Sequence, residues 1–119
     1  MSERSHTLFT RIINRELPAD FVYEDDNCVV INDIAPQANV HMLVIPRKPV
    51  KRLVDADLED KKLLGHLLWV AGEVARRTGV GDAFRVVINN GADAGQTVFH
   101  LHLHVLASSK FNELNVAVP

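Results

Sequence analysis

The sequence predicts an α+β domain in which a mainly antiparallel five-stranded sheet is combined with one long and one short helix. Five segments are rich in β-branched and other β-prone residues, and two others carry apolar residues at helical spacing. Their order is helix, three strands, helix, two strands, and strands that follow one another directly favour antiparallel pairing. We expect one domain that spans residues 1–119.

The composition is that of an ordinary globular chain. Hydrophobic residues make up 47% of the 119 residues and charged residues 24%, which is enough apolar material for a continuous core. Thirteen Lys and Arg residues against fifteen Asp and Glu residues give a net charge of −2. Such a chain has no overall positive field for nucleic acids or anionic membranes, so we expect neither as a partner.

Cysteine content and the N-terminal sequence bear on the cellular compartment. Cys28 is the only cysteine, so the chain cannot form an internal disulfide. The N-terminal sequence lacks the apolar segment of an export signal, and no run approaches the ~18 apolar residues of a membrane span. We therefore expect a cytoplasmic protein.

The first predicted element is a short amphipathic helix. Apolar residues recur at helical spacing between Leu8 and Ile13. Thr7 precedes them as a candidate N-cap, and Pro18 is expected to end the helix because it lacks a backbone donor.

Three strands are predicted next. Residues 21–23 and 28–31 are β-prone runs separated by the turn-forming sequence Asp-Asp-Asn at 25–27, which favours a hairpin. Residues 41–46 form a nearly continuous apolar run, which is typical of a strand buried on both faces.

A long helix is predicted over about residues 57–78, with Asp57 as its cap and Gly79 as its end. His66 lies off the apolar stripe and is expected on the surface, whereas Trp69 fits either a subunit contact or the core. The stripe itself consists of six residues: Leu64, Leu67, Leu68, Ala71, Val74 and Ala75.

The last two strands are predicted over residues 84–90 and 98–107. They are joined by residues 91–95, Gly-Ala-Asp-Ala-Gly, a sequence that tolerates unusual backbone angles.

The second of these strands carries the residues that point to chemistry. His100, His102 and His104 alternate with apolar residues, and strand side chains repeat every two residues, so the three imidazoles are expected to share one face. A solvent face usually carries Lys, Glu, Thr or Ser, and a core face carries aliphatic residues. A polar face with satisfied partners and a zinc site, in which three neutral imidazoles leave one position open for water, remain alternatives.

The loop before the histidines favours a phosphate ligand over a metal. Few other metal ligands lie nearby in the sequence, apart from Asp93. Gly95, Gln96 and Thr97 instead combine a flexible turn, an amide and a hydroxyl, which are donors of the kind that cradle a phosphate oxygen.

Residues 95–106, GQTVFHLHLHVL, resemble the histidine-triad motif of the HIT superfamily, His-φ-His-φ-His-φ-φ with φ apolar, and the pattern is complete at positions 100–106. Residues 8–26 and 31–48 resemble its Hint branch, the histidine-triad nucleoside phosphoramidases. The resemblance implies a HIT-like fold, a homodimer and a purine nucleotide ligand similar to AMP or GMP.

The resemblance also implies a reaction. The chain would be a hydrolase that cleaves purine nucleoside 5′-phosphoramidates to AMP and an amine through a covalent nucleotidyl-histidine, without a metal or cofactor. His102 corresponds to the nucleophile, His104 to the contact with phosphoryl oxygens and Thr97 to a hydroxyl near the leaving group. Either His104 or Thr97 could deliver a proton. His41 and His100 correspond to supporting histidines beside the nucleophile.

Further positions match the nucleotide-binding residues of the family. Asp33 corresponds to the carboxylate that accepts both ribose hydroxyls, and Asn89 to an asparagine that contacts phosphate. A turn-forming role is the alternative for each of them, and a core role is the alternative for the base pocket. The residues that resemble the apolar pocket for the base are Leu8, Phe9, Ile12, Leu17, Ile31 and Ile34.

The sequence departs from the Hint pattern after the triad. Hint proteins usually continue with Gly-Gly-Arg and a tail that reaches the partner's active site, whereas residues 107–110 here are Ala-Ser-Ser-Lys and FNELNVAVP follows. Residues 94–98 also resemble the Fhit branch, which hydrolyses dinucleoside polyphosphates with the same nucleophile. A hydrolase of that kind and a non-catalytic nucleotide-binding regulatory protein remain alternative functions.

Overall fold

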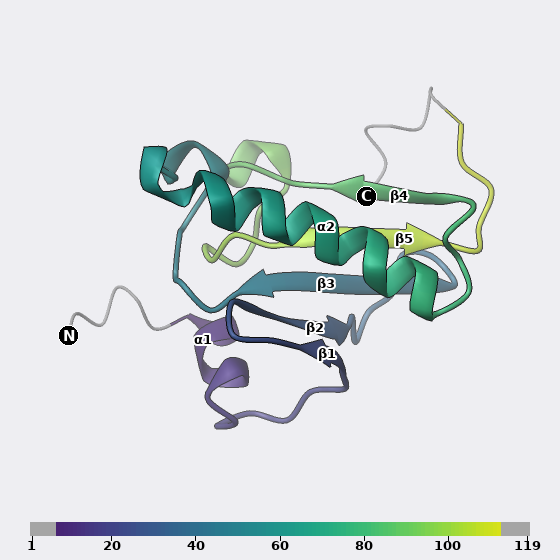
Figure 1. Ribbon diagram of the computed structural model, residues 1–119, viewed down its shortest axis with the longest axis horizontal. Helices are drawn as coiled ribbons and strands as arrows, with labels where there is room; N and C mark the ends of the chain where they lie inside the picture. The colour runs from purple at the N-terminus through teal and green to yellow at the C-terminus, as the bar shows by residue number, and fades with distance from the viewer. Residues whose placement is uncertain (1–6, 113–119) are drawn as a thin grey trace.

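A computed structural model describes residues 7–112, and Figure 1 shows a single curved sheet with a long helix lying across it. The sheet has the strand order β1-β2-β3-β5-β4, and every neighbouring pair is antiparallel. The helices and strands are α1 (Leu8–Ile13), β1 (Phe21–Glu24), β2 (Cys28–Asn32), β3 (Val40–Pro46), α2 (Lys61–Arg77), β4 (Phe84–Val87) and β5 (Leu103–Ala107). The predicted class and element order are therefore confirmed. The last seven residues of the divergent tail, 113–119, lie outside the described residues.

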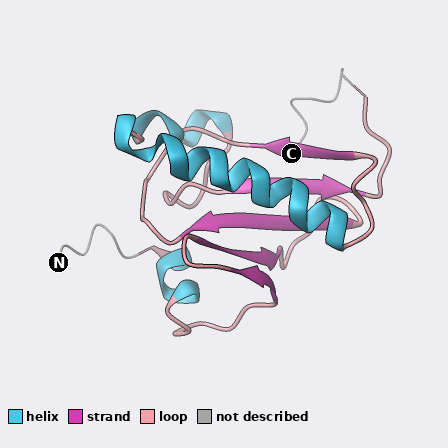
Figure 2. Cartoon of the chain, viewed as in Figure 1, coloured by secondary structure: helices cyan, strands magenta, loops and turns pink. Residues whose placement is uncertain are grey.

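The two faces of the sheet bury different side chains because side chains alternate along a strand. One face packs against α2, and its buried residues include Cys28, Val30, Met42, Val44 and Val105. The other face packs against α1, where Phe9 and Ile12 contact the cluster of Val29, Ile31, Leu43 and Ile45. Figure 2 shows α2 lying along the first of these faces. The prediction that the central strand is buried on both faces is confirmed.

The β1–β2 hairpin is held by its turn. The Asp25 side chain accepts hydrogen bonds from the backbone N–H groups of Asn27 and Cys28 at 2.8 and 2.9 Å. This side-chain turn reverses the chain between the two strands, as the Asp-Asp-Asn sequence predicts.

The ends of α1 are only partly as predicted. Thr7 is the N-cap, and its hydroxyl accepts from the backbone N–H of Thr10. The helix ends at Ile13, however, well before Pro18. Arg15 has a φ of 63°, a left-handed conformation that turns the chain out of the helix, so the expectation that Pro18 ends the helix was wrong.

The start of α2 also differs from the prediction. Asp57 caps a 3₁₀ turn, Leu58–Asp60, through a capping box, and this turn leads directly into α2 at Lys61. Gly79, with a φ of 81°, follows the helix as predicted. Leu68 and Trp69 are each 56% exposed, so the expected place of Leu68 on the buried stripe and the core alternative for Trp69 were wrong.

The two C-terminal strands are shorter than predicted. β4 ends at Val87 and β5 begins only at Leu103. Before β5 the backbone N–H of Leu101 donates to the carbonyl oxygen of Val50. Val50 lies in the connection between β3 and α2, so this hydrogen bond is not part of the sheet. His100 and His102 therefore precede the strand, and only His104 lies within it. No helix among residues 7–112 has the length and apolar character needed to cross a bilayer.

Candidate active site

Four imidazoles and one phenyl ring form a row on the α1 face of the sheet. Neighbouring ring centroids are 5.1 Å apart for His41 and His104, 5.0 Å for His104 and His102, and 4.9 Å for His102 and Phe9. The Phe9 ring also meets His100 edge-on at 6.0 Å. The expectation of a common face is confirmed by these ring contacts, although β5 itself begins only at Leu103.

The hydrogen bond of His102 fixes its tautomer. Its Nδ1 lies 2.7 Å from the carbonyl oxygen of His100, and a carbonyl oxygen can only accept. Nδ1 therefore carries the proton and donates it. In the neutral ring, Nε2 keeps its lone pair, which is the requirement for a nucleophilic imidazole.

His100 supports this arrangement from a fully buried position. Its Nε2 donates to the carbonyl oxygen of Pro46 at 2.7 Å. Its Nδ1 therefore accepts, and the hydroxyl of Thr7 donates to it at 2.9 Å. Both ring nitrogens are used, so the side chain anchors the segment whose carbonyl holds His102.

His41 and His104 form a second fixed pair across β3 and β5. The backbone N–H of Gln37 donates to His41 Nδ1 at 3.0 Å, so the proton of the neutral ring is on Nε2. Nε2 donates to His104 Nδ1 at 2.9 Å and lies 3.5 Å from a carboxylate oxygen of Asp33. His104 then carries its proton on Nε2, and it enters the site as a hydrogen-bond donor.

Burial keeps these rings neutral. It lowers the pKa of His41, His100 and His102 below the ordinary value of 6.5, against the opposing effect of hydrogen bonds or of Asp33. Burial and the neighbouring rings of His102 and His41 lower the pKa of His104 to about 4. A neutral His102 is a free base at physiological pH.

A pocket of about 420 Å³ opens beside the row, between α1 and the sheet. Its volume lies in the range of small-molecule sites. Asp33, Thr97, His102 and His104 provide polar groups at its wall. All six residues predicted for the base pocket line it: Leu8, Phe9, Ile12, Leu17, Ile31 and Ile34.

A wider hollow of about 950 Å³ lies at the β4 edge of the sheet, between residues 79–85 and 108–111. Its lining contains no histidine. The smaller pocket is the better candidate site because it combines apolar walls with buried ionisable groups.

Three predicted ligand residues lie outside the lining of the candidate pocket. Asn89 borders a small cavity with His41 and His104, and its amide donates to the carbonyl oxygen of Ala94. Gly95 has a φ of 95°, a left-handed conformation, and lies against the Asn89 side chain. In this structure the contacts of Asn89 are therefore those of a turn-forming residue, which was the alternative to phosphate binding.

The third of these residues, Gln96, is committed to the loop itself. Its side chain is buried, its oxygen accepts from the backbone N–H of Gly91, and its nitrogen donates to the carbonyl oxygens of Lys51 and Val98. The Gln96 amide was predicted to contact a phosphate, but these hydrogen bonds to the backbone already occupy both its oxygen and its nitrogen. Thr97, the next residue, is exposed and lines the pocket.

Several residues of the site were not predicted. Leu43 and Val98 add to the apolar wall. Thr7 was expected only as a helix cap, and Gln37 and Pro46 contribute through the backbone. The alternation along β3 could have placed Leu43 beside His41, whereas the contact of Thr7 with a residue 93 positions away has no local signal.

The zinc alternative for the three triad imidazoles does not fit their hydrogen bonds. Both nitrogens of His100 are engaged with protein groups, so His100 cannot be a metal ligand in this arrangement. Asp33, His41 and His104 do bring ligand atoms within 4.8 Å of one another, but both nitrogens of His41 are engaged, Nδ1 with the backbone N–H of Gln37 and Nε2 with His104.

The sequence matches the HIT domain model over residues 14–111. A HIT-like protein of Synechocystis sp. is 58% identical over 106 residues, which cover 89% of this chain and 93% of that protein. A HIT family hydrolase from Legionella pneumophila has a TM-score of 0.88 at 36% identity and covers 91% of this chain and 97% of its own. A HIT family hydrolase from Clostridium thermocellum has a TM-score of 0.86 at 36% identity, over 90% and 94% of the two chains. With its histidine row, its pocket and these relatives, the chain belongs to the HIT domain family.

Proposed function

We propose that this protein is a purine nucleoside phosphoramidase that releases AMP and an amine through a covalent nucleotidyl-histidine on His102. The observation that carries the proposal is the tautomer of His102. Its Nδ1 proton is held by the carbonyl oxygen of His100, which leaves the Nε2 lone pair for attack at the pocket.

The first step forms a bond between His102 Nε2 and the α-phosphorus and breaks the bond between phosphorus and the amine nitrogen. The departing amine needs a proton, and His104 Nε2 and the Thr97 hydroxyl are the donors at the pocket wall. In the second step water attacks phosphorus and gives a proton back to the group that protonated the amine. The N–P bond breaks, and His102 regains its neutral form as AMP leaves.

The pocket walls fit a nucleoside. The apolar side chains between α1 and the sheet provide a surface for a base, and Asp33 at the pocket provides a charged acceptor for ribose hydroxyls. One Asp33 oxygen already accepts from the backbone N–H of Ala35, and the other lies 3.5 Å from His41. The Asp33 carboxylate therefore holds the turn at Ala35 with one oxygen, and Asp33 also lines the pocket.

The surface at α2 and β4 supports self-association. β4 is an edge strand of the sheet, and Leu68 and Trp69 expose apolar area on α2. We include a homodimer and a cytoplasmic location in the proposal.

The test is AMP release from an adenosine 5′-phosphoramidate by the parent protein, His102→Ala and His66→Asn, all in excess chelator. His66 is a matched control because it belongs to α2, which packs on the other face of the sheet. We expect turnover by the parent and His66→Asn and none by His102→Ala. Equal turnover by His102→Ala would contradict the proposal. Turnover of a dinucleoside polyphosphate without phosphoramidate cleavage would favour a Fhit-like hydrolase. Nucleotide binding without any turnover would favour a regulatory protein.

A further inference from the structure

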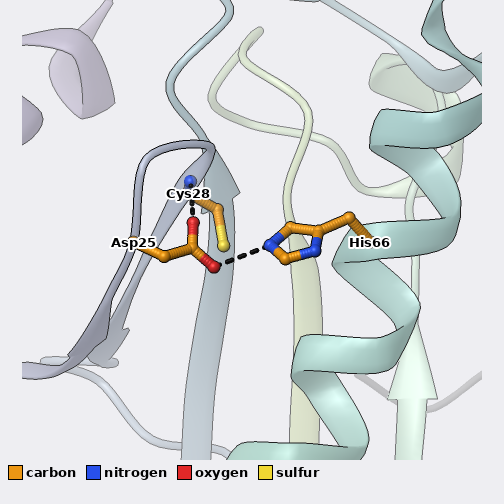
Figure 3. A group of neighbouring side chains, drawn as sticks. All are labelled: Asp25, Cys28 and His66. Atoms are coloured by element: carbon orange, nitrogen blue, oxygen red, sulfur yellow. Dashed lines mark hydrogen bonds and ion pairs between the residues drawn. The ribbon is translucent and has the colours of Figure 1, made fainter.

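A second cluster of reactive side chains lies where the tip of the β1–β2 hairpin meets α2. Figure 3 shows the Asp25 carboxylate, the Cys28 thiol and the His66 imidazole converging on one point. One ligand atom of each residue lies within 4.8 Å of the other two. Cys28 belongs to the α2 face of the sheet, so this cluster lies on the opposite face from the proposed active site.

Asp25 is held as an oriented carboxylate. Two backbone N–H groups donate to Oδ1, and the Tyr23 hydroxyl and His66 Nε2 bond to Oδ2 at 2.8 and 2.6 Å. Burial raises the pKa of Asp25, but these hydrogen bonds outweigh it and hold the pKa well below its ordinary value. The carboxylate is therefore charged and fixed, as outer hydrogen bonds fix the ligands of metal sites.

Cys28 shows why an ordinary reactive thiol does not explain the cluster. Its side chain is fully buried, and burial and the charge of Asp25 raise the pKa of the thiol to about 12. Such a thiol is neither a nucleophile nor an exposed target for oxidants. A divalent cation at the point where the three side chains converge would lower the pKa of the thiol, because it offsets the charge of Asp25 and favours the thiolate.

His66 was expected to be a surface residue, and the structure places it at the surface, half-buried and bonded to Asp25. Its side chain is 30% exposed and that of Asp25 is 23% exposed, so solvent reaches the cluster on their side while Cys28 closes the inner side. The His66 ring also stacks on Trp69 with an interplanar angle of 21°. The imidazole is thereby directed at the hairpin.

We propose that Asp25, Cys28 and His66 form a zinc site, with a water molecule from the open side as the fourth ligand. Thiolate sulfur, imidazole nitrogen and carboxylate oxygen are the donor set of tetrahedral zinc. Donor atoms in such a site are about 3.3–3.6 Å apart. The Asp25–His66 pair at 2.6 Å opens by about 1 Å to admit the ion, a shift within reach of a partly exposed side chain.

The protons balance in this binding step. Cys28 releases its thiol proton to solvent as the sulfur–metal bond forms. The proton on His66 Nε2 is replaced by the metal, and the neutral ring then carries its proton on Nδ1. Two negative ligands neutralise the divalent ion, so the site, which carries the single negative charge of Asp25 before binding, becomes neutral. The ion ties the hairpin to α2 and leaves the histidine row across the sheet unchanged.

The test is a titration of the reduced full-length protein with Co²⁺, a spectroscopic substitute for zinc. Cys28 is the only cysteine, so thiolate-to-cobalt charge-transfer absorption can arise only at this site. We expect saturable absorption at one equivalent of Co²⁺, its loss on adding Zn²⁺, and its loss in His66→Asn. Asp33→Asn is the matched control, because it removes a ligand from the other histidine–carboxylate group, and it should retain the signal.

Absence of thiolate absorption in the parent protein, or equal absorption in His66→Asn, overturns the proposal and leaves an Asp25–His66 ion pair as the role of the cluster. Cys28→Ser places a hydroxyl in the core and can disturb folding, so the partly exposed His66 carries the test. As a second measurement, Zn²⁺ should raise the Tm of the parent but not that of His66→Asn. These readouts do not depend on phosphoramidate turnover, so either proposal can fail alone.

Discussion

At the residue scale, the chemistry of the site depends on which nitrogen of each ring carries the proton. Backbone groups decide this for three of the rings: the carbonyl oxygen of Pro46 for His100, that of His100 for His102, and the N–H of Gln37 for His41. The resulting assignments give His102 a free lone pair and His104 a donor proton. A ring with a free lone pair and a ring with a donor proton thus stand side by side, as the proposed mechanism requires, without either ring being charged.

The pH dependence of catalysis follows from the burial of His102. Its pKa lies below 6.5 and protonation removes the nucleophilic lone pair, so the proposed activity should be lost only on the acid side of 6.5. We expect kcat/KM for adenosine phosphoramidate to be level through neutral pH and to fall below pH 6.5. An acid limb centred above that value would show that His102 is not held as the free base.

His41 should act through His104 as a positioning residue. In His41→Ala, His104 Nδ1 loses its donor, and the ring can adopt the tautomer with no proton on Nε2. We expect kcat to fall by about 10²-fold, the lower range for proton transfer by a positioned group, with little change in KM. A rise in KM at constant kcat would instead assign His41 to substrate binding.

Individual residues were predicted unequally well. The spacing of the histidines was sufficient to place three imidazoles on one face, although only His104 lies in a regular strand. The contact between Thr7 and His100 depends on tertiary structure and has no local pattern. Gln96 shows a further limit, because an amide beside glycines suits a phosphate contact and a loop-bracing role equally well in sequence.

At the element scale, the loop before the histidines is stabilised from within. The 3₁₀ turn Ala92–Ala94 is closed by Gly95, and the Gln96 amide joins both ends of the loop to the β3–α2 connection. This loop carries Thr97 into the pocket lining. The same β3–α2 connection also explains why β5 is short. The backbone N–H of Leu101 donates to the carbonyl oxygen of Val50 in that connection instead of to a neighbouring strand.

Removing the Gln96 amide should destabilise the whole domain. Gln96→Met keeps the side-chain length but leaves one donor and two acceptors of partly buried hydrogen bonds without their partners. We expect the free energy of unfolding to fall by about 2–4 kcal/mol, measured by urea denaturation. Asp93→Asn, at an exposed position of the same loop, should change it by less than about 0.5 kcal/mol. Equal effects of the two substitutions would contradict a bracing role for Gln96.

At the scale of the whole molecule, the two faces of the sheet separate two kinds of chemistry. The α1 face carries the histidine row and the pocket, and the α2 face carries the Asp25–Cys28–His66 cluster. The fold was predictable because each element has a clear local pattern. The second cluster was not, because it joins a turn, a strand and a helix, and because His66 lies off the apolar stripe that identified the helix.

The buried histidines make stability depend on pH. In the folded chain the pKa of His104 is about 4, and that of His41, His100 and His102 also lies below the unfolded value of 6.5. The unfolded chain therefore binds more protons in this window, so stability is complete above pH 6.5 and is lost as the pH falls towards 4. We expect a loss of about 1–2 kcal/mol from His104 alone between pH 7 and pH 5.

Urea denaturation of the parent and of His104→Gln at the two pH values measures this loss. The variant should lose part of the pH dependence, because Gln does not titrate in this range. Equal pH dependence in both proteins would show that His104 is not held neutral by the fold.

The most direct test of the central claim is to trap the intermediate. The protein is mixed with adenosine 5′-phosphoramidate, denatured in alkali within one turnover, and mapped by peptide mass spectrometry. The free Nε2 of His102 predicts an adenylyl group on the peptide that contains residues 100–104, assigned to His102 by fragmentation and absent from His102→Ala. Adenylylation of a different residue, or turnover in the parent with no adenylylated peptide, would contradict the assignment of His102 as the nucleophile.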